Sequence, residues 1–497
     1  MASIWEQTAD LERRPPLDED LRVDVAVIGA GMTGVLTAFL LQQKGARCVV
    51  LEASRIGSGQ TAGTTAKLTS QHGLIYAELI ERFGREQAQE YADANQRAVA
   101  RYRQLAAELG VACMLEEEDA FVYGLHDVEP LRREAEAAAS LGLPASFVET
   151  VPLPFPVAGA VRFSGQAQFH PLRFLAGLCR DLTVYEQTRV TEADGHSLRA
   201  NGHTVTAGQV VFATHYPFVN LPGLYFARLH QSRAYTLALE NAAHAGGMYI
   251  GAEERDLSVR AAGQLLLLCG EDHRTGENAA GGRYDALRRI AAVLYPGSRE
   301  VARWSAQDCM TPDGVPYIGR YAESTPDWYV ATGYNKWGMS SSMVAACRIS
   351  DWIAGDAPYA PGIFDPRRFN ADTAVEVLQT GGQALKGLGL QYLTVPETQV
   401  GELPEGHGGV VSTETEEKVG VYREQGGCLH AVGTRCPHMG CQVAWNPDEK
   451  SWECPCHGSR FDLDGHVIDN PAQEDLPQAR VTPCADGKPD ETAPDVE

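Results

Sequence analysis

Residues 23–54 read VDVAVIGAGMTGVLTAFLLQQKGARCVVLEAS, and this stretch decides the fold of the first part of the chain. VDVAVI is a short apolar run typical of a buried strand. VLTAFLLQQKG is rich in helix formers and ends at Gly45, a natural helix C-cap, and RCVVLE predicts a second strand. Strand, helix and strand in this order predict a right-handed β-α-β unit.

The turn between the first strand and the helix, GAGMTG, places Gly29, Gly31 and Gly34 in the spacing G-x-G-x-x-G. The first glycine permits a tight turn, the second lets the backbone approach a pyrophosphate, and the third lets helix and strand pack closely. Glu52 ends the second strand, where an acid can accept hydrogen bonds from ribose hydroxyls. The motif predicts a dinucleotide site without distinguishing FAD from NAD, and a glycine turn that binds no ligand is the alternative.

Composition narrows the function classes. The chain has 497 residues, which favours two to four domains, and a formal net charge of −23, which argues against a nucleic-acid partner. No apolar run is long enough for a transmembrane segment, and the first twenty residues hold no apolar signal core. Most of the twelve cysteines are scattered, as expected of reduced thiols. We therefore expect a soluble, cytoplasmic protein.

Three further stretches carry a family resemblance: ASRIGSGQTAGTTAKLTSQHGLIY at 53–76, QVVFATH at 209–215 and MTPDGVPYIGR at 310–320. Together with the glycine turn they resemble the D-amino-acid-oxidase superfamily, which includes FAD-dependent glycine and sarcosine oxidising enzymes. The resemblance implies an α/β fold, in which a Rossmann-like FAD domain carries an inserted α+β substrate domain. It also implies FAD as the cofactor, because the glycine motif alone leaves that open.

The resemblance implies where FAD would touch the chain and which residues would lie near its ring. It places Lys67 and His72 near the flavin ring. Cys309 is out of register with the cysteine that attaches flavin in some relatives, so we expect non-covalent FAD. Trp337 stands where many members have a histidine. The implied cofactor contacts are Gly29, Gly31, Gly34, Glu52, Gly63, Thr64, Asp313, Gly314, Gly338 and Met339.

The substrate is less well defined by the sequence. The usual family chemistry is hydride removal from a carbon next to nitrogen or oxygen, and the flavin supplies that chemistry. Arg233, in the expected strand HQSRAYTLALE, can clamp a substrate carboxylate with two hydrogen bonds, and a surface or structural arginine is the alternative. No second G-x-G-x-x-G stands between a strand and a helix, which argues against NAD(P)H as the electron donor. The other catalytic candidates, each with a purely structural role as its alternative, are Lys67, His72, Tyr235, Tyr317 and Lys336.

A second motif lies near the C-terminus, where CPHMGC at 436–441 is followed by CPCHGSRF at 454–461. Each half holds one cysteine and one histidine in the spacings Cys436-x-His438 and Cys454-x-x-His457. Zinc fingers usually keep cysteines in one pair and histidines in the other. The mixed pairs suit a [2Fe–2S] centre with two thiolates on one iron and two imidazoles on the other, and zinc is the alternative.

The same region resembles the Rieske domain over about residues 390–480, including GGCLHAVGTRCPHMGC and FDLDGHVIDNPA. The resemblance implies that the four residues named above are the cluster ligands. It also implies a disulfide between Cys441 and Cys456, as in the cytochrome bc-type branch. Ser459 matches a serine that donates to a bridging sulfide. Phe461 stands where high-potential members have tyrosine, so we expect a lower reduction potential.

The predicted domain boundaries follow from these two resemblances. We expect an FAD-dependent oxidoreductase at 1–365, a linker at 366–389, an all-β Rieske domain at 390–482 and an acidic tail at 483–497. The FAD-binding parts would be about 20–90, 150–225 and 305–357, and the substrate-domain parts about 91–149 and 226–304.

The predicted function is a flavin-dependent dehydrogenase that oxidises a small organic substrate, an amine or amino acid. Electrons would pass from FAD to the Rieske cluster and on to an external one-electron carrier such as a ferredoxin, cytochrome or quinone. Two alternatives stay open. An external donor can feed the flavin through the cluster, or the protein can be a redox sensor or electron carrier without substrate turnover.

Overall fold

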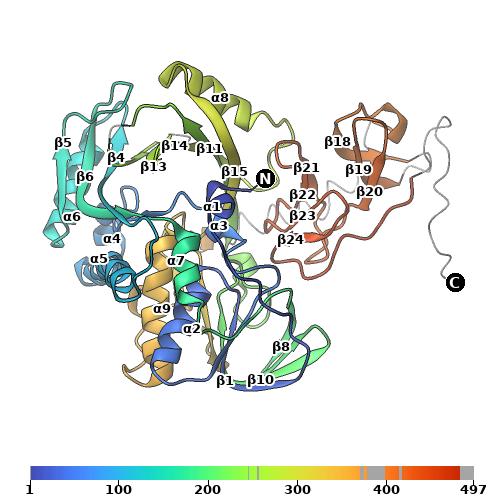
Figure 1. Ribbon diagram of the computed structural model, residues 1–497, viewed down its shortest axis with the longest axis horizontal. Coiled ribbons are helices and arrows are strands. Elements are labelled where there is room, and N and C mark those ends of the chain that lie inside the picture. Colours follow the sequence, from blue (N-terminus) through green and yellow to red (C-terminus); the bar gives the residue numbers. More distant parts are fainter. Residues whose placement is uncertain are drawn as a thin grey trace. The chain divides into compact units, whose positions relative to one another are not determined.

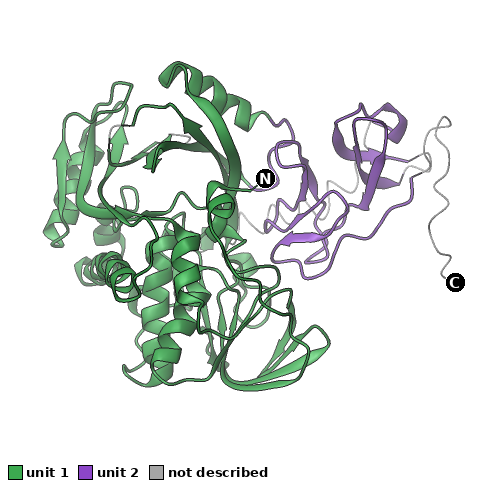
Figure 2. Cartoon of the chain, in the orientation of Figure 1, with its two compact units in different colours: residues 1–274, 282–380 green, residues 275–281, 381–497 purple. Residues whose placement is uncertain are grey.

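A computed structural model describes residues 2–244, 246–253, 257–369, 374–375, 377, 398–413 and 417–481. The chain forms two units, coloured green and purple in Figure 2. Unit 1 holds residues 1–274 and 282–380, and unit 2 holds residues 275–281 and 381–497. Among the described helices, none combines the length and the apolar character needed to cross a bilayer.

The first sheet of unit 1 grows from the predicted β-α-β unit (Figure 1). β1 (Leu21–Ile28) pairs in parallel with β2 (Cys48–Leu51) and with β10 (His203–Phe212), in the order β16-β17-β10-β1-β2-β7. The second half of β1 is buried on both faces, which explains its unbroken apolar run. The other strands of this sheet are β7 (Val184–Tyr185), β8 (Val190–Asp194), β9 (Ser197–Ala200), β16 (Tyr317–Ala322) and β17 (Thr325–Thr332).

Helices pack against this sheet, and two of them, α2 (Met32–Gln43) and α9 (Gly338–Ala354), also contact each other. α2 follows the glycine turn. Since α9 follows β17, a second strand–turn–helix lies beside the first one. The helix-rich stretch 77–110 is interrupted at Gly84, whose φ of +80° ends the first helix. The remaining helices are α1 (Ile4–Thr8), α3 (Gln60–Gly63), α4 (Tyr76–Phe83), α5 (Arg85–Glu108), α6 (Glu129–Ser140), α7 (Pro171–Leu178) and α8 (Arg283–Leu294).

The second sheet of unit 1 is largely antiparallel and carries the candidate substrate-domain residues. Its order is β15-β11-β14-β13-β12-β4-β6-β3, with β5 attached to β6. The predicted strand HQSRAYTLALE is β11, which lies between β14 and β15. Its strands are β3 (Lys67–Leu68), β4 (Glu116–Gly124), β5 (Ala145–Val148), β6 (Gly159–Gln168), β11 (His230–Glu240), β12 (Met248–Gly251), β13 (Ser258–Ala262), β14 (Leu265–Arg274) and β15 (Arg299–Met310).

Unit 2 is built from two small antiparallel sheets, as the all-β expectation requires. One contains β18 (Gly408–Ser412), β19 (Lys418–Arg423) and β20 (Leu429–Gly433). The other contains β21 (Ala444–Asn446), β22 (Ser451–Glu453), β23 (Arg460–Phe461) and β24 (Val467–Asp469). Most of the predicted linker at 366–389 and all of the predicted tail at 483–497 lie outside the described residues.

Candidate functional site

The glycine turn has the geometry that a dinucleotide site requires. Gly29 has a φ of +100°, and a Cβ built on it would lie 2.6 Å from the carbonyl oxygen of Ala213. A Cβ on Gly34 would lie 1.9 Å from the carbonyl oxygen of Gly29, so only glycine lets α2 start this close to β1. Neither position has room for a side chain. With only glycine here, a pyrophosphate can come close to the backbone of the turn, as in known dinucleotide sites.

Backbone donors hold Glu52 at the end of β2. The N–H groups of Ala30 and Ser54 donate to its two carboxylate oxygens at 2.7 and 2.8 Å. Burial raises the pKa of Glu52, and these two hydrogen bonds oppose that shift. Each carboxylate oxygen has a second acceptor position, so both can accept from ribose hydroxyls. The residues of this region thus fit the FAD that the sequence predicts.

The turn that holds the implied cofactor contacts Asp313 and Gly314, and the turn before α9, are braced by residues that the sequence did not single out. The carboxylate of Asp313 is buried and receives two hydrogen bonds from Arg368, at 2.7 and 2.8 Å. Asn335 accepts from the N–H of Thr311 at 2.7 Å, which joins the 311–314 turn to the turn before α9. Gly314 has a φ of +70°, as a tight turn requires. The predicted role of Asp313 as a cofactor contact stays a prediction.

The remaining predicted cofactor contacts lie at helix ends. Gly63 ends α3, and its carbonyl accepts from the indole N–H of Trp304 at 2.9 Å. The carbonyl of Thr64 accepts from the indole of Trp5 at 2.7 Å, which fastens the N-terminal helix α1 to this segment. Gly338 and Met339 are the first two residues of α9. No motif in the sequence indicated the contribution of Trp5.

Lys67 lies in β3, and its ammonium group is buried. Its Nζ donates to the hydroxyls of Ser258 at 2.5 Å and Thr65 at 3.3 Å. Burial lowers the pKa of Lys67 to about 7, because the charged form loses its hydration. Lys67 therefore has the protonation equilibrium of a general base near neutral pH.

His72 is packed on all sides. Its Nδ1 lies 2.6 Å from the hydroxyl of Tyr91, its Nε2 lies 2.8 Å from the hydroxyl of Ser340, and its ring stacks on Trp337. Burial lowers its pKa to about 3, so the imidazole is neutral at physiological pH. These contacts brace the start of α9, and a catalytic role for His72 stays a prediction.

Among the other catalytic candidates, Arg233 and Tyr235 make hydrogen bonds to neighbouring side chains, and Tyr317 is buried. The guanidinium of Arg233 donates to Ser305 and Gln307, each at 2.6 Å, so a carboxylate clamp has to share these donors. The hydroxyl of Tyr235 lies 3.0 Å from the ring of His273. Tyr317 is fully buried, with the guanidinium carbon of Arg368 4.2 Å from its ring centroid.

Lys336 belongs to a group of charged residues that also includes Asp272 and Asp308, and all three side chains keep some exposure to solvent. Its Nζ lies 2.6 Å from the carboxylate of Asp272. Asp308 interacts electrostatically with Lys336 and with Arg233, and burial raises its pKa to about 6. Cys269 interacts electrostatically with both Lys67 and Lys336. We call Lys67, Cys269, Asp272, Asp308 and Lys336 the polar cluster.

Cys309, at the end of β15, is an ordinary buried thiol. It is 1% exposed, and the hydroxyl of Thr332 donates to its sulfur at 3.6 Å. Burial raises its pKa to about 12. The protonated thiol is unreactive, in keeping with the expectation of non-covalent FAD.

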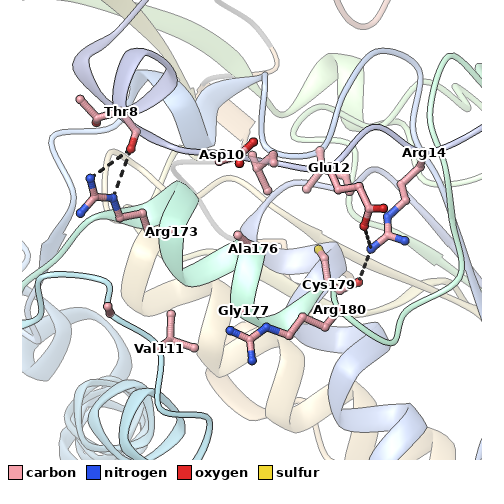
Figure 3. A pocket seen from close by; sticks show the side chains of 13 residues that line it. Thr8, Asp10, Glu12, Arg14, Val111, Arg173, Ala176, Gly177, Cys179 and Arg180 are labelled. Carbon is pink, nitrogen blue, oxygen red and sulfur yellow. Dashed lines mark hydrogen bonds and ion pairs between the residues drawn. The ribbon is translucent and has the colours of Figure 1, made fainter.

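A separate pocket of about 460 Å³ opens beside α7 and the N-terminal segment (Figure 3). Arg173 donates twice to the carbonyl of Thr8, at 3.2 and 3.1 Å, and Arg14 donates to the carbonyl of Cys179 at 2.9 Å. These arginines fasten the N-terminal segment. None of the predicted cofactor or catalytic residues lines this pocket.

In unit 2 the two Cys/His loops bring their predicted ligands together in two pairs, one of histidines and one of cysteines. The Nδ1 atoms of His438 and His457 lie 3.2 Å apart, and the thiols of Cys436 and Cys454 are within hydrogen-bonding distance of each other. Both cysteines and His457 are buried. Two thiols and two imidazole nitrogens form the donor set of a Rieske [2Fe–2S] centre, and the residues fit that group.

Backbone and side-chain donors surround the two ligand sulfurs. The N–H groups of His438 and Met439 donate to the sulfur of Cys436, which also interacts with the hydroxyl of Ser459. Ser459 in turn accepts from the N–H of Ala472 at 3.0 Å, which orients its hydroxyl. Hydrogen bonds to sulfur stabilise thiolate ligands. The serine predicted to donate to a bridging sulfide thus lies beside a ligand sulfur.

The remaining two cysteines of the motif join the loops. Cys441 and Cys456 form a disulfide, as the sequence resemblance implied. Both are buried, which shields the bond from reductants. Phe461 is fully buried in β23.

Two known protein families match this chain, one over the region of the glycine turn and one over the region of the Cys/His loops. Residues 24–352 match the model of the FAD dependent oxidoreductase family, and residues 394–480 match that of the Rieske [2Fe-2S] domain. The chain belongs to the FAD-dependent oxidoreductase family. It carries a C-terminal Rieske domain, and its cofactors are FAD and a [2Fe–2S] cluster.

Similar proteins cover either the whole chain or one of its parts. A protein described as "Putative Rieske 2Fe-2S iron-sulfur protein YhfW", from Bacillus subtilis, is 35% identical over 96% of this chain and 97% of its own length. The cytochrome b6-f complex iron-sulfur subunit of Synechococcus elongatus is 38% identical over 14% of this chain and 34% of its own length. Full-length similarity to the Bacillus protein shows that the fusion of both domains is shared.

Solved structures resemble the oxidoreductase part in fold. Glycine oxidase from Geobacillus kaustophilus superposes with a TM-score of 0.60 at 20% identity, over 71% of this chain and 100% of its own. L-proline dehydrogenase from P. horikoshii gives a TM-score of 0.59 at 18% identity, over 71% of this chain and 98% of its own. At these identities the likeness shows the fold alone.

Proposed function

We propose that the protein is a flavin-dependent dehydrogenase that oxidises an amine or amino acid and passes the electrons through its Rieske cluster to an external carrier. The observation that carries the proposal is the presence of complete residue sets for both cofactors in one chain. FAD accepts two electrons from an organic substrate, and a [2Fe–2S] cluster passes electrons on singly. A fused cluster would be superfluous if oxygen reoxidised the flavin directly.

The polar cluster supplies the proton chemistry of this proposal. Substrate amines are protonated in neutral solution, and an ammonium group has to lose a proton before hydride can leave the adjacent carbon. Neutral Lys67 accepts that proton, since burial places its pKa at about 7. Asp272 holds Lys336 in place as a cation. The pair has no net charge, but the ammonium of Lys336 has three N–H donors, and those that Asp272 does not accept can donate to a substrate carboxylate.

Substitution of Lys67 tests the proton acceptor. In the native protein the rate of flavin reduction should rise with pH through about 7, because the neutral form of Lys67 becomes populated. Lys67→Arg keeps a cation that cannot accept a proton, and we expect it to lower the plateau rate by about 100-fold and to abolish this rise. The measurement is the pH profile of anaerobic flavin bleaching. A variant that keeps the rise near pH 7 would assign the titration to another group.

The direction of electron flow is tested by anaerobic mixing with a panel of amines and amino acids. Flavin bleaching followed by the EPR signal of the reduced cluster supports the proposal. If the cluster is reduced first by a ferredoxin or similar donor, electrons flow toward the flavin. If no substrate in the panel bleaches the flavin, a sensor or carrier role replaces the proposed dehydrogenase. The proposed external acceptor is a ferredoxin, cytochrome or quinone in the cytoplasm.

The reduction potential of the cluster provides a further prediction at Phe461. Phenylalanine cannot donate a hydrogen bond, whereas Phe461→Tyr adds a hydroxyl at this buried position. One added hydrogen bond of about 1.5 kcal/mol to the reduced cluster corresponds to a rise of roughly 60 mV for one electron. Redox titration followed by EPR measures the shift, with Phe461→Leu as the control that adds no donor. Equal midpoints for the native and tyrosine proteins would contradict the prediction.

A further inference from the structure

Seven residues from the oxidoreductase part of the sequence belong structurally to the cluster-binding unit. Thr275–Gly281, with the sequence TGENAAG, connects β14 to α8, both of which belong to unit 1. This stretch lies inside the predicted substrate-domain part at 226–304. Its contacts nevertheless group it with residues 381–497, and it is coloured purple in Figure 2. We call these seven residues the inserted segment.

Two glycines let the inserted segment lie directly on the second cluster loop and its neighbour. Gly276 has a φ of +86°, and a Cβ on it would lie 2.6 Å from the Cα of Pro455. Pro455 stands between the ligand Cys454 and the disulfide cysteine. Gly281 has a φ of +64°, and a Cβ on it would lie 2.6 Å from Cγ of Pro447. Neither position tolerates a side chain without displacement of the neighbouring proline.

Between the glycines, Asn278 is buried and hydrogen-bonded to unit 2. It is 3% exposed, and its amide nitrogen lies 3.1 Å from Oδ1 of Asn446 and 2.9 Å from Oδ2 of Asp448. Oδ1 of Asn446 also accepts from the backbone N–H of Asp448 at 3.1 Å. Asn278 thus holds the β21–β22 turn by two side-chain hydrogen bonds.

The network continues to the residue before the ligand Cys454. Glu453 is fully buried; its Oε2 accepts from the N–H of Gly276 at 3.1 Å, and its Oε1 accepts from Asn446 at 3.0 Å. Arg460 lies 3.3 Å from the same carboxylate, and it also pairs with Asp469 at 2.8 Å. A buried ionic network is stable only when its members are all satisfied. The inserted segment provides donors to three acidic or amide residues of the network, Glu453, Asn446 and Asp448.

We propose that the inserted segment is a positioning element for the cluster loop at 454–457, with Asn278 as its central residue. The segment makes a backbone hydrogen bond to Glu453 and side-chain hydrogen bonds to the β21–β22 turn. Together these contacts fix β22, the strand that directly precedes Cys454. The Rieske unit of this protein is therefore incomplete without residues from the oxidoreductase sequence. Retention of the cluster depends on a residue more than a hundred positions before the first ligand.

Variants of the full-length protein with both cofactors test the proposal. Asn278→Asp replaces the donor with a carboxylate beside the carboxylate of Asp448, and Asn278→Ala removes the donor without adding charge. We expect iron release to a chelator to accelerate about 10- to 100-fold in Asn278→Asp and less in Asn278→Ala. The EPR signal of the reduced cluster should broaden or shift in both. Glu277→Gln, at an exposed position of the same segment, is the matched control and should behave as native.

A second substitution separates positioning from general destabilisation. Asp448→Asn, added to Asn278→Asp, restores one donor and one acceptor with their order reversed, and should slow iron release at least severalfold relative to Asn278→Asp alone. The visible spectrum of bound FAD serves as the readout for unit 1 and should not change. Release at the control rate in both Asn278 variants would overturn the proposal. So would a fast Asn278→Asp variant that Asp448→Asn does not slow.

Discussion

Replacement of Cys454 by serine is expected to remove the iron–sulfur cluster while FAD remains fully bound. Cys454 is buried, and the N–H groups of Cys456 and His457 donate to its sulfur. Serine oxygen is a poor ligand for this centre, and loss of a direct ligand should exceed the 10- to 100-fold cost of losing a supporting hydrogen bond. We therefore expect iron content near zero and reduction of an external acceptor lowered by at least about 100-fold.

The controls for Cys454→Ser come from the same chain. Cys428→Ser changes an exposed free thiol in the same unit and should leave iron, sulfide and the EPR signal at native values. Anaerobic substrate should still bleach the flavin of Cys454→Ser, because the glycine turn and Glu52 are unchanged. Acceptor reduction that continues at the native rate without iron would mean that electrons leave the flavin directly.

Both cofactors and the local geometry of their motifs could be predicted, because the residues of each motif are close together in the sequence. The spacing of Gly29, Gly31 and Gly34 prescribes a turn geometry, and the structure has the positive φ and the close backbone approach that this spacing requires. The Cys/His loops behave likewise, since each ligand pair lies within four residues. The disulfide between Cys441 and Cys456 was available only through the family resemblance, because cysteine spacing does not prescribe pairing.

Residues that act through long-range contacts could not be predicted. Asp272 and Asp308 come near each other because β14 and β15 flank β11, and the turn before α9 brings Lys336 to them. No single segment of the sequence contains the information that sets this strand order. Arg368 reaches Asp313 from 55 residues away in sequence. Asn278 is the extreme case, since 168 residues separate it from Asn446. Its one sequence signal, glycines on both sides of a polar stretch, is common to ordinary surface turns.

Gly34→Ala is expected to abolish FAD binding while the cluster is retained. The added Cβ would lie 1.9 Å from the carbonyl oxygen of Gly29. Side-chain rotation cannot relieve this clash, because the backbone alone sets the positions of both atoms. Either α2 moves away from β1 or the turn opens, and both outcomes displace the backbone N–H groups at the start of the helix. These groups face the pyrophosphate in dinucleotide sites. We expect the purified variant to contain FAD at under about a tenth of the native occupancy.

The matched control for Gly34→Ala is Gly45→Ala, at the other end of the same helix. Gly45 has a φ of +87°, and among the described residues no atom beyond its chain neighbours lies within 4 Å of an added Cβ. Alanine there therefore brings backbone strain of about 1 to 3 kcal/mol without a clash. This variant should lose some thermal stability and keep its FAD. The Rieske EPR signal reports in both variants whether unit 2 is folded. If Gly34→Ala bound FAD with native affinity beside an intact cluster, the cofactor would have to be held elsewhere, because this turn has no room for both a side chain and a pyrophosphate.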